Sequence, residues 1–290
     1  KHMPKKSHPM DVARTAVSVM GLEDKETTDS SPEANMRKAL RIFAKTPTAL
    51  AAFYRIRKGK KIIKPKKTLT FAENFFYMCF GKVPKKEIVK AFDVSLILYA
   101  EHSFNVSTFT ARTITSSLSD IHGAITGAIA SLKGPLHGGA NEEVMHMMNK
   151  IKKPENALKW INNALKNKEV VMGFGHRVYK SGDSRVPTMR KYFGKVAKIK
   201  KDKKFEKIYD IVEKVMIKEK NIYPNVDYPT GPTYHLMGFD TDFFTPIFVI
   251  SRITGWSAHI MEQHAANKLI RPLASYKGSK HRKVMQLNQR

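Results

Sequence analysis

The sequence has one cysteine, few acidic residues and no long apolar run, and each shortage excludes a class of protein. With Cys79 as the single cysteine among 290 residues, neither a disulfide framework nor a cysteine-based metal site is expected. A membrane-spanning helix needs about 18 consecutive apolar residues. The longest candidate, residues 107–132, contains Arg112, Asp120 and His122. We therefore expect a soluble, cytoplasmic protein without a membrane partner.

Acidic residues are scarce relative to basic ones. The chain has 25 Asp and Glu against 52 Lys and Arg, a formal net charge of +27, and such a field attracts polyanions. The lysines lie mainly in residues 58–67 and 195–220, where no aromatic residues alternate with them as a base-stacking platform requires. We expect a lysine-rich surface and no nucleic-acid partner. A basic helical nucleic-acid-binding protein stays the more distant alternative.

The sequence also lacks a series of alternating strands separated by hairpin turns, whereas helical patterns recur along it. Ser30 or Ser31 followed by Pro32 is typical of a helix start. With 42% hydrophobic residues the chain can form a substantial core. The predicted fold class is therefore all-α. Further helical patterns cover residues 83–104, 153–167, 186–199 and 245–270.

Residues 107–132 are dominated by Ser, Thr, Ala and Gly. Because small side chains let helices approach closely, this composition predicts a buried helix–helix contact. That contact is either part of a subunit interface or an ordinary intramolecular core, and the sequence leaves both open.

The segment GPLHGGANEEV, residues 134–144, sets His137 before two glycines and a predicted helix. The positive potential of a helix N-terminus disfavours imidazolium, so a neutral ring is expected. A neutral imidazole can donate a hydrogen bond to an oxygen that becomes negative during a reaction. A lone histidine in such a turn is more often structural, so His137 needs companions to become a candidate for catalysis.

A second histidine follows glycines in GFGHRVYKSGDSR, residues 173–185. His176 precedes three cations there, Arg177, Lys180 and Arg185. The GFG stretch is too short for a dinucleotide-binding fingerprint, so we expect no such site.

An acid and two further arginines complete the set of unusual polar residues. Asp227 lies in YPNVDYPTGP and is expected in a rigid, Pro-bounded turn, either as a base kept away from helix caps or as a turn or cap residue. Arg252 lies inside a very apolar helical pattern, and Arg271 follows it. An arginine on an apolar face needs an anion, and no acidic residue stands three or four positions from Arg252.

Together these segments resemble the citrate synthase family. The similarity runs from HPMDVARTAVSVMG (8–21) to the end of the chain, through LYAEHSFNVSTFTART, GPLHGGANEEV, GFGHRVYK, NVDYPTGP and SRITGWSAHIMEQ in the family's order. Within the family, the segment that follows NVDY is most similar to 2-methylcitrate synthases. Members of this branch often accept both acetyl-CoA and propionyl-CoA.

The resemblance implies a Claisen-type condensation of an acyl-CoA with oxaloacetate, followed by thioester hydrolysis, without a metal or a cofactor. It implies that Asp227 is the base, that His137 donates a hydrogen bond to the thioester oxygen, and that His176 polarises and protonates the oxaloacetate carbonyl. The resemblance assigns His102, Arg185, Arg252 and Arg271 to oxaloacetate binding, Arg271 acting in the partner subunit, and Gly173, Gly175 and Lys180 to CoA binding.

The resemblance also implies an architecture and an assembly. We expect a large helical domain, residues 1–138 and 239–290, interrupted by a smaller helical domain at 139–238, in a homodimer. Members of the family normally have a longer segment before the part that matches HPMDVART, so we expect part of the large domain to be missing. A dedicated citrate synthase is the nearest alternative, and a truncated, inactive relative is another.

Overall fold

The regular elements of the chain are helices. In the computed structural model, which describes residues 3–280 and 282–290, they are twelve α-helices and two short 3-10 helices, so the all-α fold class is confirmed. Residues 1, 2 and 281 of the expected large domain lie outside the described ones. The helices are α1 (Pro9–Glu23), α2 (Pro32–Arg57), α3 (Phe71–Phe80), α4 (Lys86–Tyr99), α5 (Val106–Ser116), α6 (Ile121–Leu132), α7 (Ala140–Ile151), α8 (Pro154–Lys166), α9 (Val186–Lys200), α10 (Lys204–Lys220), α11 (Asp227–Met237), η1 (Thr241–Phe243), α12 (Phe244–Ala265) and η2 (Leu287–Gln289).

Helix boundaries follow capping residues in the sequence. Ser31 is the N-cap of α2, where its hydroxyl accepts a backbone N–H of the first turn, and Pro32 follows it as predicted. Thr70 and Glu73 form a reciprocal capping box at the start of α3. That helix ends at Gly81, whose φ of 80° is the left-handed conformation that suits glycine.

Helix α12 lies at the centre of the fold. It packs against α1, α2, α4, α5 and α6, and its Trp256 side chain is fully buried. The helix predicted over 245–270 ends at Ala265 instead, because Asn267 and Ile270 bond to Ser116 at the end of α5. Among the described helices, α12 included, none combines the length and the apolar character needed to cross a membrane.

The small-residue stretch 107–132 forms two helices, α5 and α6, that pack against each other. Asp120 caps α6 by accepting the N–H of Gly123 at 2.9 Å. A Cβ at Gly127 would lie 2.2 Å from Cδ1 of Ile114, so the Ile114 side chain packs directly over this glycine and would have to shift for any larger residue. The predicted helix contact is therefore present within one chain. Phe109 on α5 keeps an exposed face, and a subunit interface stays a prediction.

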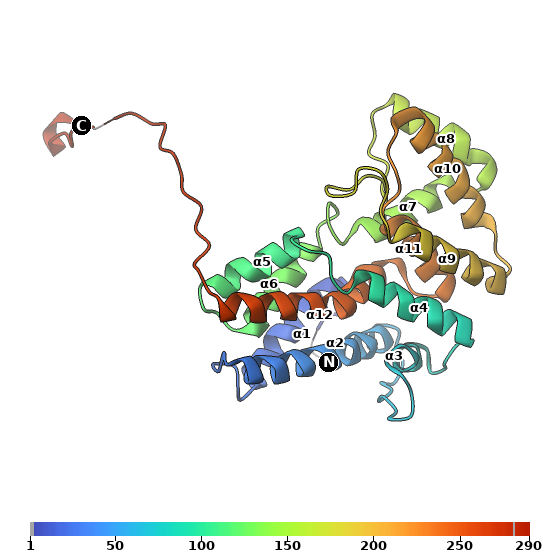
Figure 1. The fold of residues 1–290 in the computed structure, drawn as a ribbon, viewed down its shortest axis with the longest axis horizontal. Coiled ribbons are helices and arrows are strands. Elements are labelled where there is room, and N and C mark those ends of the chain that lie inside the picture. Colours follow the sequence, from blue (N-terminus) through green and yellow to red (C-terminus); the bar gives the residue numbers. More distant parts are fainter. Residues whose placement is uncertain (1–2, 281) are drawn as a thin grey trace.

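Figure 1 shows two groups of helices and an arm. Helices α7 to α11 pack among themselves at one end, and α1 to α6 gather around α12 at the other. The chain passes between the groups at residues 133–139 and again after α11. After Ile270, which still bonds to Ser116, it leaves the body as an extended arm.

Candidate active site

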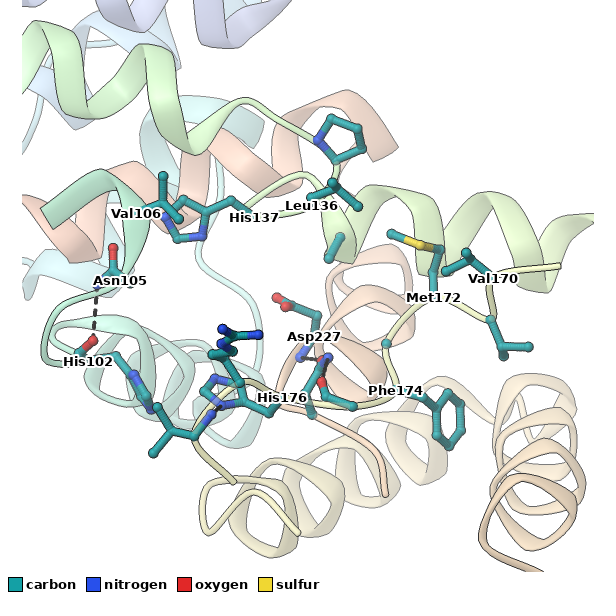
Figure 2. Close-up of a pocket in the computed structure, with 18 of the residues that line it drawn as sticks. His102, Asn105, Val106, Leu136, His137, Val170, Met172, Phe174, His176 and Asp227 are labelled. Atoms are coloured by element: carbon teal, nitrogen blue, oxygen red, sulfur yellow. Dashed lines mark hydrogen bonds between the residues drawn. The ribbon is translucent and has the colours of Figure 1, made fainter. Parts of the chain in front are cut away.

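Two adjoining cavities, of about 480 Å³ and about 90 Å³, bring together segments that are far apart in the sequence. Figure 2 shows His137, His176 and Asp227 reaching the larger cavity from three different segments. Arg185 and Arg252 line the smaller one. The two cavities share His102, Asn105, His137, His176, Asn225 and Asp227.

His137 lies in the loop that joins α6 to α7, and Ser107 fixes its orientation. The Nε2 atom of His137 accepts the backbone N–H of Ser107 at 3.3 Å and lies 2.8 Å from the Ser107 hydroxyl. An Nε2 that accepts a backbone N–H cannot carry a proton, so the proton of the neutral ring is on Nδ1. The hydroxyl is itself held by the indole N–H of Trp256, which it accepts at 3.1 Å.

The pKa of His137 is lowered to about 4, so the ring is neutral at physiological pH. Burial is the main cause and the positive charge of Arg252 is the second. The helix whose N-terminus was expected to keep the His137 ring neutral begins three residues later, at Ala140. The expected protonation state is thus present, with desolvation as its dominant cause.

Asp227 is the first residue of α11, and the predicted turn away from helix caps is wrong. The prolines that suggested a turn are compatible with this helix. Pro229 lies in the first turn, where backbone N–H groups have no intrahelical partner, and Pro232 lies inside the helix. The Thr230 hydroxyl donates to the Val226 carbonyl at 2.7 Å and satisfies one backbone group at this end.

The environment of Asp227 raises its pKa to about 6. Burial is the dominant cause, and two neighbours act against it. The Tyr99 hydroxyl donates to Oδ1 of Asp227 at 2.5 Å, and the charge of Arg185 also favours the carboxylate. The group is therefore a stronger base than an exposed aspartate and is still mostly ionised at neutral pH.

His176 lies in the loop before α9. Its Nδ1 accepts the backbone N–H groups of Val178 at 3.0 Å and Tyr179 at 3.3 Å, so the neutral ring carries its proton on Nε2. Burial lowers the pKa of His176, and Arg185 adds to the effect. The ring packs edge-on against His102, with the ring centroids 4.9 Å apart.

Arg185 and Arg252 bring two positive charges to the smaller cavity. Asp183 binds Arg185 through two hydrogen bonds, from Nε at 2.9 Å and from Nη2 at 2.7 Å. Burial acts to lower the pKa of Arg185, but the ion pair outweighs it and the pKa is raised.

Arg252 is 2% exposed and donates from Nε to the Tyr99 carbonyl at 2.6 Å. No carboxylate among the described residues forms an ion pair with Arg252. Burial and the charge of Arg185 lower its pKa to about 10, so it stays charged at neutral pH. A buried, uncompensated guanidinium favours a bound anion.

The remaining predicted residues divide into two groups. Gly173 and Gly175 line the larger cavity, with φ values of 84° and 78°. Lys180 is exposed and is not among the described residues that line either cavity, where Arg177 is found instead. Arg271 lies in the extended arm, away from both cavities of its own chain.

Three residues of this site escaped the sequence analysis: Ser107, Tyr99 and Asp183. Asp183 stands two positions before Arg185 and accepts the N–H of Val226 at 3.0 Å, so its proximity to a candidate arginine was a usable signal. Tyr99 gave no such signal, because its partner Asp227 lies 128 positions away.

Comparison with known proteins agrees with this geometry. Residues 1–273 match the family model described as citrate synthase, C-terminal domain. The chain is 53% identical to a citrate synthase of Mycolicibacterium smegmatis, over 98% of this chain and 76% of that one. It is also 53% identical to a 2-methylcitrate synthase of Mycobacterium tuberculosis, over 97% of this chain and 71% of that one.

A solved structure is similar over nearly the whole chain. It is a ternary complex of citrate synthase from Thermoplasma acidophilum with carboxymethyl coenzyme A and oxaloacetate. The TM-score is 0.90 at 34% sequence identity, and the match covers 99% of this chain and 77% of that one.

Proposed function

This chain belongs to the citrate synthase family, and we propose that its two cavities condense an acyl-CoA with oxaloacetate and then hydrolyse the thioester. The observation that carries the proposal is the convergence of Asp227, His137 and His176 on cavities that also contain Arg185 and Arg252. An acid of raised pKa, a neutral imidazole and buried cations are the groups that a carbon–carbon condensation with a dicarboxylate needs. No metal or cofactor is required by this chemistry.

Asp227 would remove the α-proton of the thioester. Its raised pKa, about 6, reduces the pKa difference between this base and the weakly acidic α-carbon of the thioester. His137 would donate from Nδ1–H to the thioester oxygen as it becomes an enolate, because its Nε2 already accepts from Ser107. The donor is neutral and fixed in advance, so little reorganisation accompanies the proton transfer.

Oxaloacetate would occupy the smaller cavity, where Arg185 and Arg252 offer guanidinium groups to its two carboxylates. His176 would donate from Nε2–H to the carbonyl that the enolate attacks, and His102 would contact the same substrate. We assign the wider cavity around Gly173 and Gly175 to CoA. Arg177, which lines this cavity, is better placed for a CoA phosphate than Lys180, which lines neither cavity.

The assembly is also part of the proposal. We propose a homodimer in which Arg271 on the extended arm reaches the partner's oxaloacetate pocket. Residues 1–138 with 239–290 would form one domain and residues 139–238 the other, with His137 at the hinge. Closure of this hinge on oxaloacetate would exclude water before the condensation. We place the reaction in the cytoplasm, within the tricarboxylic acid or the methylcitrate cycle.

We propose 2-methylcitrate synthase activity, with propionyl-CoA, acetyl-CoA or both as the acyl donor. The two acyl chains differ by one methyl group, which an apolar pocket distinguishes by about 1–3 kcal/mol. A dedicated citrate synthase is the alternative. The ratio of kcat/KM for the two acyl-CoAs decides between them.

The test follows free thiol in a mixture of the protein, oxaloacetate and either acyl-CoA, and mass spectrometry identifies the product. Thiol release that depends on oxaloacetate, with 2-methylcitrate or citrate as product, is the expected result. Equal thiol release without oxaloacetate would identify a thioesterase instead. No release by a folded protein would contradict the proposal.

A further inference from the structure

The first turns of three helices meet at one carboxylate, Glu142. His8 is the N-cap of α1, Glu142 is the third residue of α7, and Thr245 is the second residue of α12. Helix N-termini carry partial positive charge from their unpaired N–H groups. A carboxylate among three such ends is electrostatically favoured, and Glu142 is well placed for this because its side chain is 12% exposed.

Both oxygens of the Glu142 carboxylate are used. Oε1 accepts the backbone N–H of Thr245 at 3.2 Å and also the Thr245 hydroxyl. Oε2 lies 3.3 Å from Nε2 of His8. Since Nδ1 of His8 accepts the N–H of Met10, the proton of the neutral ring is on Nε2 and points at Glu142. The carboxylate therefore accepts hydrogen bonds from α1 and α12 while it belongs to α7.

The contacts of Glu142 lie near two groups of the candidate active site, His137 and Arg252. Glu142 follows His137 by five residues, and the Thr245 hydroxyl lies 3.4 Å from the carbonyl oxygen of Gly138, the neighbour of His137. On the other side, Thr245 lies in the first turn of the helix that carries Arg252 and Phe248. The Phe248 ring packs edge-on against that of His137, with 6.4 Å between the ring centroids. The same carboxylate thus links the His137 loop to the helix of an oxaloacetate-binding arginine.

We propose that Glu142 is a positioning residue, which holds the His137 loop against α1 and α12 at the junction of the two helix groups. It does not touch substrate and acts through Thr245 and His8. This inference rests on the proposed function for its catalytic consequence, because a displaced His137 donates poorly to the thioester oxygen. A displacement of about 1 Å at a catalytic group can cost about 10²-fold in rate.

The role requires a carboxylate rather than any polar side chain of the same length. In Glu142→Gln the amide oxygen can still accept from Thr245. Its NH2 group then faces the Nε2–H of His8, donor against donor. The substitution also removes the negative charge from among the three helix ends. Glu143, the next residue, is exposed and has no side-chain hydrogen bond or ion pair among the described residues, so Glu143→Gln is a matched control.

The experiment compares the unsubstituted full chain with Glu142→Gln, Thr245→Val and Glu143→Gln. For each protein it measures kcat and KM by thiol release, oxaloacetate binding by calorimetry, and hydrogen exchange of the peptide that covers residues 133–140. Glu142→Gln is expected to lower kcat roughly 10- to 100-fold, to change oxaloacetate affinity less than kcat, and to speed exchange in 133–140. Thr245→Val should move kcat and exchange in the same direction, and Glu143→Gln should change neither.

The outcomes separate positioning from simple stabilisation. If Glu142→Gln lowers the melting temperature while kcat per folded molecule and loop exchange match the control, Glu142 is a structural residue and the proposal is wrong. If Glu142→Gln does not fold, Thr245→Val decides by the same two readouts. If the unsubstituted chain releases no thiol, the proposed function fails, and hydrogen exchange alone still tests whether Glu142 holds the loop.

Discussion

The smaller cavity and the larger cavity are adjacent but are constructed differently. In the smaller one, each charged group is fixed by another part of the protein: Arg185 by Asp183, Arg252 by the Tyr99 carbonyl, and Asp227 by the Tyr99 hydroxyl. Apart from the residues that the two cavities share, the wall of the larger one consists mainly of glycine backbone and apolar side chains, with Arg177 among them. Leu136, Val170 and Val178 are exposed there.

The difference between the two cavities indicates that the smaller one serves the reaction and the larger one serves ligand binding. Prearranged charges suit a small dianion and a reacting carbon, because they need no reorganisation during the reaction. An open, apolar and glycine-lined wall suits a long ligand whose contacts serve binding rather than chemistry. Substitutions of the groups around the smaller cavity should therefore affect the rate or the KM for oxaloacetate, and substitutions in the wall of the larger one should mainly affect stability and the KM for the acyl-CoA.

The largest effect is expected from Asp227→Asn. Loss of the base should lower kcat by about 10²- to 10⁴-fold, while oxaloacetate binding persists because both arginines remain. Burial raises the pKa of Asp227 above its ordinary 3.8, so the folded chain binds more protons than the unfolded chain between pH 4 and 6. The contribution of Asp227 to the free energy of unfolding therefore falls as the pH rises through that window. The variant should therefore melt at a higher temperature than the unsubstituted chain at pH 8. A rate within about threefold of the original would remove Asp227 from the mechanism.

Asp183→Asn should have the next largest effect. It frees Arg185 from its bidentate partner and leaves a buried guanidinium uncompensated, so about 3 kcal/mol of stability should be lost. The KM for oxaloacetate should rise roughly tenfold, about 1.4 kcal/mol. The control is Asp210→Asn, which breaks the exposed pair with Arg190 and should cost less than about 1 kcal/mol. Equal effects of the two variants on KM would show that the Arg185 pair does not position the cation.

Tyr99→Phe should have a smaller effect of a particular kind. The Tyr99 hydroxyl holds the pKa of Asp227 down, so its loss should raise that pKa further above the present value. The acid limb of kcat/KM should move to higher pH, and the rate at pH 8 should fall by less than about tenfold. A pH profile that coincides with that of the unsubstituted chain would show that the hydrogen bond has no effect on the base.

The smallest effect is expected in the larger cavity, from Gly175→Ala. The φ of Gly175 is 78° and a Cβ there would have its nearest contact at 3.6 Å, so only backbone strain of about 1 kcal/mol is expected. Gly173→Ala adds a clash, 2.7 Å from Val144, and should lose clearly more stability in a thermal melt. Neither should change the pH dependence of kcat. Equal losses would mean that the wall around Gly173 can move.

Features of the fold that depend on neighbouring residues in the sequence were predicted better than features that depend on distant residues. Ser31 and Pro32 fixed a helix start correctly because capping depends on neighbours within one turn. The prolines around Asp227 misled, since a proline is tolerated in the first helical turn and a single sequence does not reveal where that turn begins.

In the candidate site, too, local sequence patterns identified residues but not their distant partners. Histidines beside glycines and an arginine in an apolar helix marked residues that line the cavities. The groups that set their chemistry were not predictable, because Ser107 is 30 positions from His137 and Tyr99 is 128 positions from Asp227. Arg271 could not be placed either, because the arm that carries it does not return to its own chain.

The most direct test of Asp227 as the base is the pH dependence of kcat/KM for the acyl-CoA at saturating oxaloacetate. If buried Asp227 is the base, kcat/KM rises with pH as the carboxylate ionises, with a midpoint near the pKa of about 6. A midpoint near 4, the ordinary value of an exposed aspartate, or no acid limb above pH 4, would contradict it.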